Sequence, residues 1–194
     1  MKKSKRNELF DIEKGILIVF VVLGHLIDSD SKLHQVIFSF HMPVFFMLTG
    51  MLSHWDVDKK DFIRKRTLSY VIPYFSWCVL LFIFFWIENP LKYIIRIIYG
   101  GAMNSTAYTY PFWFINCLFM SSIIFKLCFC RVRWLFIALC GWLIIWYMFL
   151  TNVDIPPLPW SLEVVPFVLL YFYLGIISKK LEGIALNRLG WGGI

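Results

Sequence analysis

Apolar runs separated by short charged segments make up most of this chain. Six such runs occur, and most are long enough to cross a hydrocarbon core, which takes about 20 residues of α-helix. They lie near residues 8–27, 34–52, 68–87, 111–130, 133–150 and 160–178. The pattern predicts an all-α protein, a polytopic transmembrane helical bundle that forms one membrane-embedded domain over residues 1–194. The short polar segment 28–32 predicts that the first two spans form an antiparallel hairpin, and the basic segment 59–66 is expected to be a loop before the third span.

Composition agrees with a membrane protein. Hydrophobic residues make up 60% of the chain and aromatic residues 20%, which is too apolar for a soluble domain. The net charge of +7 does not indicate a nucleic-acid partner, because the basic residues stand in short blocks between apolar runs. Almost all of the five cysteines lie inside apolar runs, so we expect neither a disulfide framework nor a metal site.

The basic residues also predict the topology. With Lys14 set aside, 15 Lys and Arg residues flank one side of the predicted bundle and 3 flank the other. Because cytoplasmic loops carry the excess of positive charge, both termini are predicted to be cytoplasmic, in a multi-pass protein of the cell (inner) membrane. The lipid bilayer is then the first expected partner. Residues 91–99, with Lys92 and Arg96 one turn apart, predict an amphipathic helix in the outer interface.

The first predicted span, near residues 8–27, carries unusual polar residues. Its purely apolar part, 15–24, is too short to cross a bilayer, so the span must include a charged first turn. Lys14 and His25 are 11 residues apart and share one helix face, separated by roughly 16 Å along the axis. Ionisable residues in a spanning helix favour a functional site. The alternative is that Lys14 reaches the inner interface and His25 sits in interfacial water.

Two later segments add candidate chemistry. His41 precedes Pro43, which removes a helical hydrogen bond and frees the carbonyl of Ser39, so this second imidazole can face the same cavity as His25. Glu163, at the outer end of the last run, is the best acidic candidate for orienting an outer histidine, unless it is simply solvated. Asn116 is a candidate for an interhelical hydrogen bond.

Several of these segments together resemble a known family. They are Asp11-Ile12-Glu13-Lys14-Gly15-Ile16, Val21-Val22-Leu23-Gly24-His25, Phe40-His41-Met42-Pro43-Val44-Phe45-Phe46 with Thr49-Gly50, Trp113-Phe114-Ile115 and the stretch 160–166. This set resembles the acyltransferase-3 family of integral membrane acyltransferases, in particular its branch of sugar O-acetyltransferases that modify surface polysaccharides. Lys14 and His25 match the family's basic residue, ten positions and histidine. Thr49 stands where serine is common, and Glu163 where aspartate is expected.

The resemblance implies transfer of an acyl group, acetyl in this branch, from acetyl-CoA to a hydroxyl of a carbohydrate, lipid-linked or free, on the outer side. It implies His25, His41 and Glu163 as catalytic residues. The donor's phosphates would be held by Lys14, with Asp11, Arg64 and Arg66 as further donor-binding residues. Histidine suits the catalytic role because its unperturbed pKa, near 6.5, lets it accept a hydroxyl proton near neutral pH. Family members usually have more spanning helices, so this chain is expected to be incomplete at its C-terminus.

A transporter of small molecules, coupled to protons or not, is the competing function, together with a non-catalytic membrane subunit. In either case Glu13, Lys14 and His25 would line a proton or substrate pathway. The sequence leaves open the acceptor, the choice between direct transfer and an acyl-enzyme, and whether the protein forms a homo-oligomer.

Overall fold

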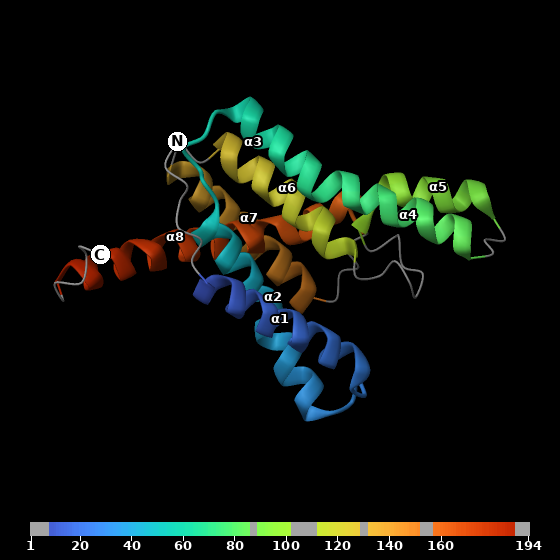
Figure 1. The fold of residues 1–194 in the computed structure, drawn as a ribbon, viewed down its shortest axis with the longest axis horizontal. Helices are drawn as coiled ribbons and strands as arrows, with labels where there is room; N and C mark the ends of the chain where they lie inside the picture. The colour runs from blue at the N-terminus through green and yellow to red at the C-terminus, as the bar shows by residue number, and fades with distance from the viewer. Residues whose placement is uncertain (1–7, 86–88, 102–111, 129–131, 152–156, 189–194) are drawn as a thin grey trace. The chain divides into compact units, whose positions relative to one another are not determined.

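The described residues of the computed structural model form helices and no strand, which confirms the all-α fold (Figure 1). The structure describes residues 8–85, 89–101, 112–128, 132–151 and 157–188. The basic N-terminal block and the residues at 86–87, 111 and 129–130 that belong to predicted spans lie outside these ranges.

The helices of the described residues have the following bounds. In chain order they are α1 (Glu8–Leu26), α2 (Lys32–Leu52), α3 (Lys59–Arg66), a π-helical turn (Thr67–Val71), α4 (Ile72–Phe84), α5 (Pro90–Tyr99), α6 (Trp113–Cys128), α7 (Val132–Leu150), a 3-10 helix (Pro159–Val164) and α8 (Val165–Arg188).

Three continuous helical stretches in the described residues are long and apolar enough to cross a membrane. They are Lys32–Leu52, Lys59–Phe84 and Pro159–Leu181, and the apolar α6 is shorter, with 16 residues. The chain divides into two compact units, one formed by residues 1–52 and 171–194 and the other by residues 53–170. The number of six spans remains a prediction. Helices α1 and α7 have 19 residues each, but they are not among the stretches that are both long and apolar enough to cross a membrane.

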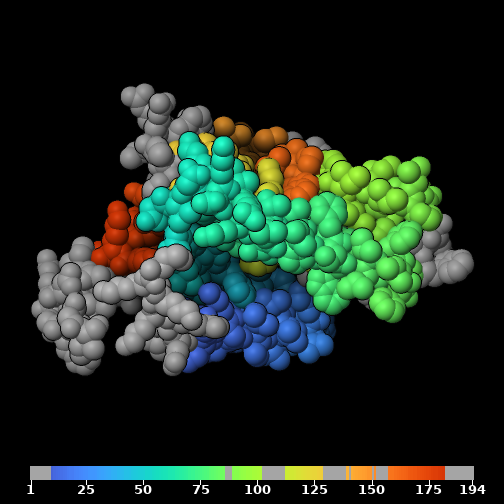
Figure 2. All heavy atoms as spheres, turned by 45° about the horizontal axis from the view of Figure 1, so that its top comes forward, coloured from blue at the N-terminus to red at the C-terminus, as the bar shows by residue number. Residues whose placement is uncertain are grey.

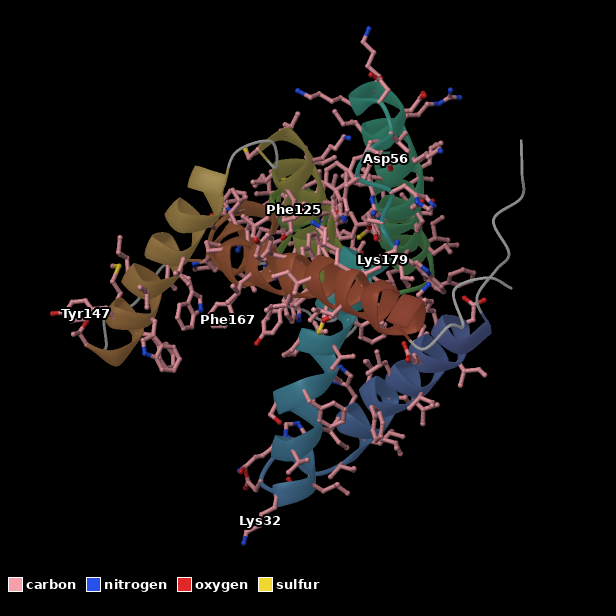
Figure 3. The ribbon with its side chains drawn as sticks, turned by 90° about the vertical axis from the view of Figure 1, so that its left-hand side faces the viewer. Lys32, Asp56, Phe125, Tyr147, Phe167 and Lys179 are labelled. Carbon is pink, nitrogen blue, oxygen red and sulfur yellow. The ribbon has the colours of Figure 1, made fainter. Side chains whose placement is uncertain are left out.

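In the first unit, α1 and α2 form the predicted hairpin (Figure 1). Its tip is ordered by Ser31, whose Oγ accepts a hydrogen bond of 3.1 Å from the backbone N–H of His34. Figure 3 shows Lys32 at this tip, directed away from the helices. Gly24 lets α1 approach α2 closely, because a Cβ there would lie 2.8 Å from Phe38 Cε2.

Two glycines bring α2 against the part of α8 that belongs to the first unit. A Cβ on Gly50 would overlap the backbone of Phe172, and a Cβ on Gly175 would overlap the carbonyl of Met47. Small residues at such crossings let helix backbones pack directly, which is how helices associate in lipid. This contact fixes α2, which carries His41.

In the second unit, one continuous helix runs from Lys59 to Phe84. The basic segment 59–66 was predicted to be a loop before a span starting near 68, but it is helical. Asp58 caps it, accepting a hydrogen bond of 2.9 Å from the backbone N–H of Lys60. Pro73 has no N–H for the carbonyl of Ser69, and the wider π turn lies directly before it.

The amphipathic helix predicted at 91–99 is present as α5, which packs along α4 (Figure 2). Two tyrosines join the helices: the hydroxyl of Tyr74 donates to the carbonyl of Ile97 at 2.8 Å, and that of Tyr93 to the carbonyl of Cys78 at 2.9 Å. These four residues form a buried cluster. Placement of α5 in the outer interface stays a prediction.

Candidate functional site

The N-terminal half of α1 carries an exposed ion pair. Lys14 Nζ lies 4.0 Å from Asp11 Oδ1, one turn earlier, and the two side chains are 45% and 38% exposed. An exposed pair of this kind contributes little to stability, about 0–1 kcal/mol. Because both side chains are exposed, Asp11 does not bury the Lys14 ammonium. The ammonium therefore remains accessible to an anionic ligand.

A cavity of about 410 Å³ opens between α1, α2 and α8 of the first unit, and its α1 wall is formed by Phe10 and Glu13, each one residue before a member of this ion pair. Its lining combines an apolar wall with one carboxylate and one hydroxyl: Phe10, Glu13, Val44, Met47, Leu48, Met51 and Ser178. The Ser178 hydroxyl donates to the carbonyl of Leu174 at 2.9 Å. Methionine and leucine side chains adapt readily to a flexible chain, so this cavity suits a thin, largely apolar ligand.

His41 is buried at 2% exposure, in the middle of α2. Its Nδ1 lies 2.6 Å from the carbonyl oxygen of Ile37. The carbonyl that this ring contacts is thus the one a full turn before His41, and not that of Ser39, which Pro43 leaves without a backbone N–H. In the neutral ring this contact requires the proton on Nδ1, which leaves the Nε2 lone pair as the basic group.

The ring of Phe38 gathers three imidazoles in the α1–α2 hairpin. His25, exposed on the last turn of α1, meets it edge-to-face with ring centroids 5.7 Å apart. His41 also meets it edge-to-face at 4.9 Å, and His34 stacks on it at 4.2 Å. The structure thus brings His25 and His41 onto one aromatic side chain. Sequence reasoning missed His34 and Phe38, although the spacing 34, 38, 41 already places them on one helix face.

Arg66 is held firmly in the second unit. Its guanidinium donates to the hydroxyl of Tyr70 at 2.9 Å and to the hydroxyl of Ser53. The same group lies 5.0 Å from the ring centroid of Phe62 and 5.5 Å from that of Tyr70. Aromatic rings and hydroxyls hold this guanidinium in place without neutralising its charge. The positive charge can therefore attract an anion.

A second cation lies near the same aromatic ring. Lys126 donates to the carbonyl of Trp55, and its Nζ is 5.7 Å from the Phe62 ring centroid. Arg64, two residues before Arg66, is exposed. Lys126 was not among the residues singled out from the sequence, because 71 positions separate it from Trp55 and only the fold brings them together.

Glu163 lies in the 3-10 helix that precedes α8 and is partly buried. Its Oε2 accepts a hydrogen bond of 3.1 Å from the backbone N–H of Leu158. Glu163 belongs to the second unit and His25 and His41 to the first, so a role in orienting a histidine stays a prediction. No group of three or more His, Cys, Asp or Glu side chains in the described ranges is arranged to hold a metal ion.

Comparison with known proteins connects this arrangement to a family. Residues 7–190 match the family model of the acyltransferase-3 proteins, described as an acyltransferase domain. The nodulation protein NolL of Mesorhizobium japonicum is 28% identical over 137 residues, which cover 63% of this chain and 36% of the relative. NolL of Sinorhizobium fredii is 35% identical over 91 residues, which cover 40% of this chain and 25% of the relative.

The matched segments thus span about a third or less of these curated relatives. No solved structure matches the chain significantly. The family match, however, covers almost all of it, including the residues of α1 and α2 described above. The chain therefore belongs to the acyltransferase-3 family.

Proposed function

We propose that this protein transfers an acyl group, acetyl in the simplest case, from cytoplasmic acyl-CoA to a hydroxyl of a cell-surface carbohydrate outside the inner membrane. One observation carries the proposal. The α1–α2 hairpin bears an accessible cation at Lys14, lines an apolar cavity through Phe10 and Glu13 of α1, and holds His25 and His41 on the ring of Phe38 farther along.

The inner end of the hairpin suits the donor. Coenzyme A is polyanionic at its nucleotide and thin along its pantetheine arm. The ammonium of Lys14 complements a phosphate, and the cavity of about 410 Å³ lined by the neighbouring residue Glu13 is the proposed place of the arm. The rise of α1 between Lys14 and His25, roughly 16 Å, matches the length of an extended pantetheine chain. Arg64 and Arg66, which belong to the second unit, are the further donor-binding residues expected from the sequence, and the Arg66 guanidinium has no carboxylate among its described contacts.

The imidazoles suit the chemical step. A histidine takes the proton from the acceptor hydroxyl while its oxygen attacks the thioester carbonyl carbon. A carbon–oxygen bond forms, the carbon–sulfur bond breaks, and the departing thiolate of coenzyme A takes the proton from the imidazolium. His25 is the proposed base. His41, with Nδ1 engaged by Ile37, presents Nε2 as a second acceptor, and Glu163 is the proposed carboxylate that orients a histidine.

The test is acyl transfer by membranes that contain the protein. Free coenzyme A thiol and acetyl incorporated into surface polysaccharide are measured together, with membranes lacking the protein as the control. We expect both products to appear in equal amounts. Movement of a solute across the membrane without thiol release would favour the transporter and overturn the proposal.

A further inference from the structure

The carboxylate of Glu13 lines the cavity between α1, α2 and α8 of the first unit. The adjacent cation, Lys14, pairs with Asp11 and not with Glu13. In the part of the chain that the structure describes, the Glu13 carboxylate makes no hydrogen bond or ion pair. An ionisable side chain within a predicted span usually serves a function, so a carboxylate free to bind at the wall of a cavity indicates a ligand.

The α2 and α8 walls of this cavity are fixed by backbone contact. A Cβ on Gly175 of α8 would overlap the carbonyl of Met47 and lie 2.9 Å from the backbone nitrogen of Met51. Both methionines line the cavity, and Ser178, which also lines it, follows Gly175 by one turn. The backbones therefore hold the cavity in place, while the methionine side chains can adjust to what enters it.

Both polar groups of the cavity are hydrogen-bond acceptors. The Ser178 hydroxyl donates its one proton to the carbonyl of Leu174 at 2.9 Å, which leaves only the lone pairs of its oxygen. The ionised carboxylate of Glu13 can only accept. The complement of this pair is a group that donates, an N–H or an O–H. A carboxylate also repels phosphate, so the nucleotide end of coenzyme A does not suit this cavity.

The rest of the lining distinguishes between possible donors. The remaining lining residues are all apolar: Phe10, Val44, Met47, Leu48 and Met51. A sugar ring bears hydroxyls on most of its carbons, and most of these would face apolar walls without a partner, which is costly. The pantetheine arm instead alternates short hydrocarbon segments with two secondary amides. Each amide presents a single N–H, so the arm matches a cavity with few acceptors and much apolar surface.

We propose that Glu13 determines the specificity for the acyl donor by accepting a hydrogen bond from an amide N–H of the pantetheine arm. The oxygen of Ser178 is the second acceptor. This inference rests on the proposed acyl transfer and deepens it: the donor is recognised by its amides, separately from the phosphates proposed to lie at Lys14. Thioesters that carry the amides are therefore donors, and thioesters without an amide are poor ones.

The first experiment measures equilibrium binding of pantetheine, which has neither phosphate nor acyl group, to the purified full chain. We expect Glu13→Leu to raise the Kd about tenfold or more, because a hydrogen bond to a charged acceptor is lost. Glu13→Gln should have a smaller effect, since its carbonyl still accepts but carries no charge. Ser178→Ala should raise the Kd about two- to tenfold. Thermal stability should be unchanged in both Glu13 variants, because no protein partner of the carboxylate is lost.

Asp30→Leu is the matched control. It also replaces an exposed carboxylate of the α1–α2 hairpin by leucine, but Asp30 does not line the cavity, so the Kd should stay at the wild-type value. An unchanged Kd in Glu13→Leu would overturn the inference. A loss of thermal stability in both Glu13 variants would show that the carboxylate is structural and would overturn it as well.

The second experiment compares two small acetyl donors in membranes, S-acetyl-N-acetylcysteamine, which has one amide, and the acetyl thioester of mercaptoethanol, which has none. Wild type should have the higher kcat/KM with the first, and Glu13→Leu should lose this preference. A preference that persists in Glu13→Leu would contradict the inference. The two proposals fail separately: pantetheine binding that depends on Glu13 without acetyl transfer would refute the transferase and retain the site, whereas transfer with binding indifferent to Glu13 would do the reverse.

Discussion

Replacing Phe38 with leucine should slow acyl transfer without affecting donor binding. The ring makes edge-to-face contacts with His25 and His41 and stacks on His34. Each aromatic contact of this kind contributes about 0.5–1.5 kcal/mol beyond buried area. His25 is exposed, so the Phe38 contact is a main restraint on its ring. Loss of the contacts to His25 and His41 then predicts a fall in kcat of about 5- to 150-fold, since 1.4 kcal/mol is tenfold.

The assay is initial-rate acetyl transfer in membranes, normalised to folded protein, with the KM for acetyl-CoA measured in parallel. Phe40→Leu is the matched control. Phe40 makes a comparable edge-to-face contact between the same two helices, with Phe20 at 5.2 Å, and among the described residues no imidazole ring packs against it. It should lower stability in a similar way and leave kcat within a few-fold. A Phe38→Leu protein that folds and turns over within twofold of wild type would refute the positioning role.

Three further changes test the hairpin. His25→Ala should lose about 10²–10⁴ in the rate of transfer with acetyl-CoA binding retained, and near-normal transfer would refute its role as the base. Lys14→Met should weaken acetyl-CoA binding more than Lys14→Arg, measured by equilibrium titration, because charge at a phosphate is required; equal affinity in Lys14→Met and wild type would exclude that role. Gly175→Ala should destabilise by at least about 1–3 kcal/mol in thermal unfolding, because its Cβ meets the Met47 carbonyl and neither backbone can yield; unchanged stability would contradict the crossing.

Hydrophobic periodicity was sufficient to predict the hairpin of α1 and α2 and the amphipathic α5. It failed at residues 59–66 because charge was taken as a sign of a loop. High charge keeps a segment out of hydrocarbon, but lysine and arginine are good helix formers, and Asp58 caps the first turn. The π turn before Pro73 was not predictable in the same way. A proline removes one backbone N–H from the helix but does not determine how the preceding turn rearranges.

The candidate site was predictable only in part. Lys14 and His25 stand out because they are ionisable residues at the two ends of the apolar run 15–24 of a predicted span, and this signal can be seen without knowing the fold. Contacts between distant segments give no such signal: Lys126 with Trp55, or Trp160 with the carbonyl of Ile98. At Asn116 the prediction failed in another way. Its amide was a candidate for an interhelical hydrogen bond, but in the folded structure neither polar atom of the side chain has a hydrogen-bond partner among the described residues.

The polar side chains of α2 give a reason to single out His41. In lipid, each polar group needs a partner, and a helix can provide one through its own carbonyls. Ser39 donates to the carbonyl of Val36 at 2.7 Å, and Thr49 to that of Phe45 at 2.9 Å. Serine could make the latter bond equally well, so Thr49 is a mild departure from the family. A hydroxyl that donates its one proton to a backbone carbonyl has no further proton to donate. His41 differs, because its Nδ1 bonds the carbonyl of Ile37 while its Nε2 can still accept a proton.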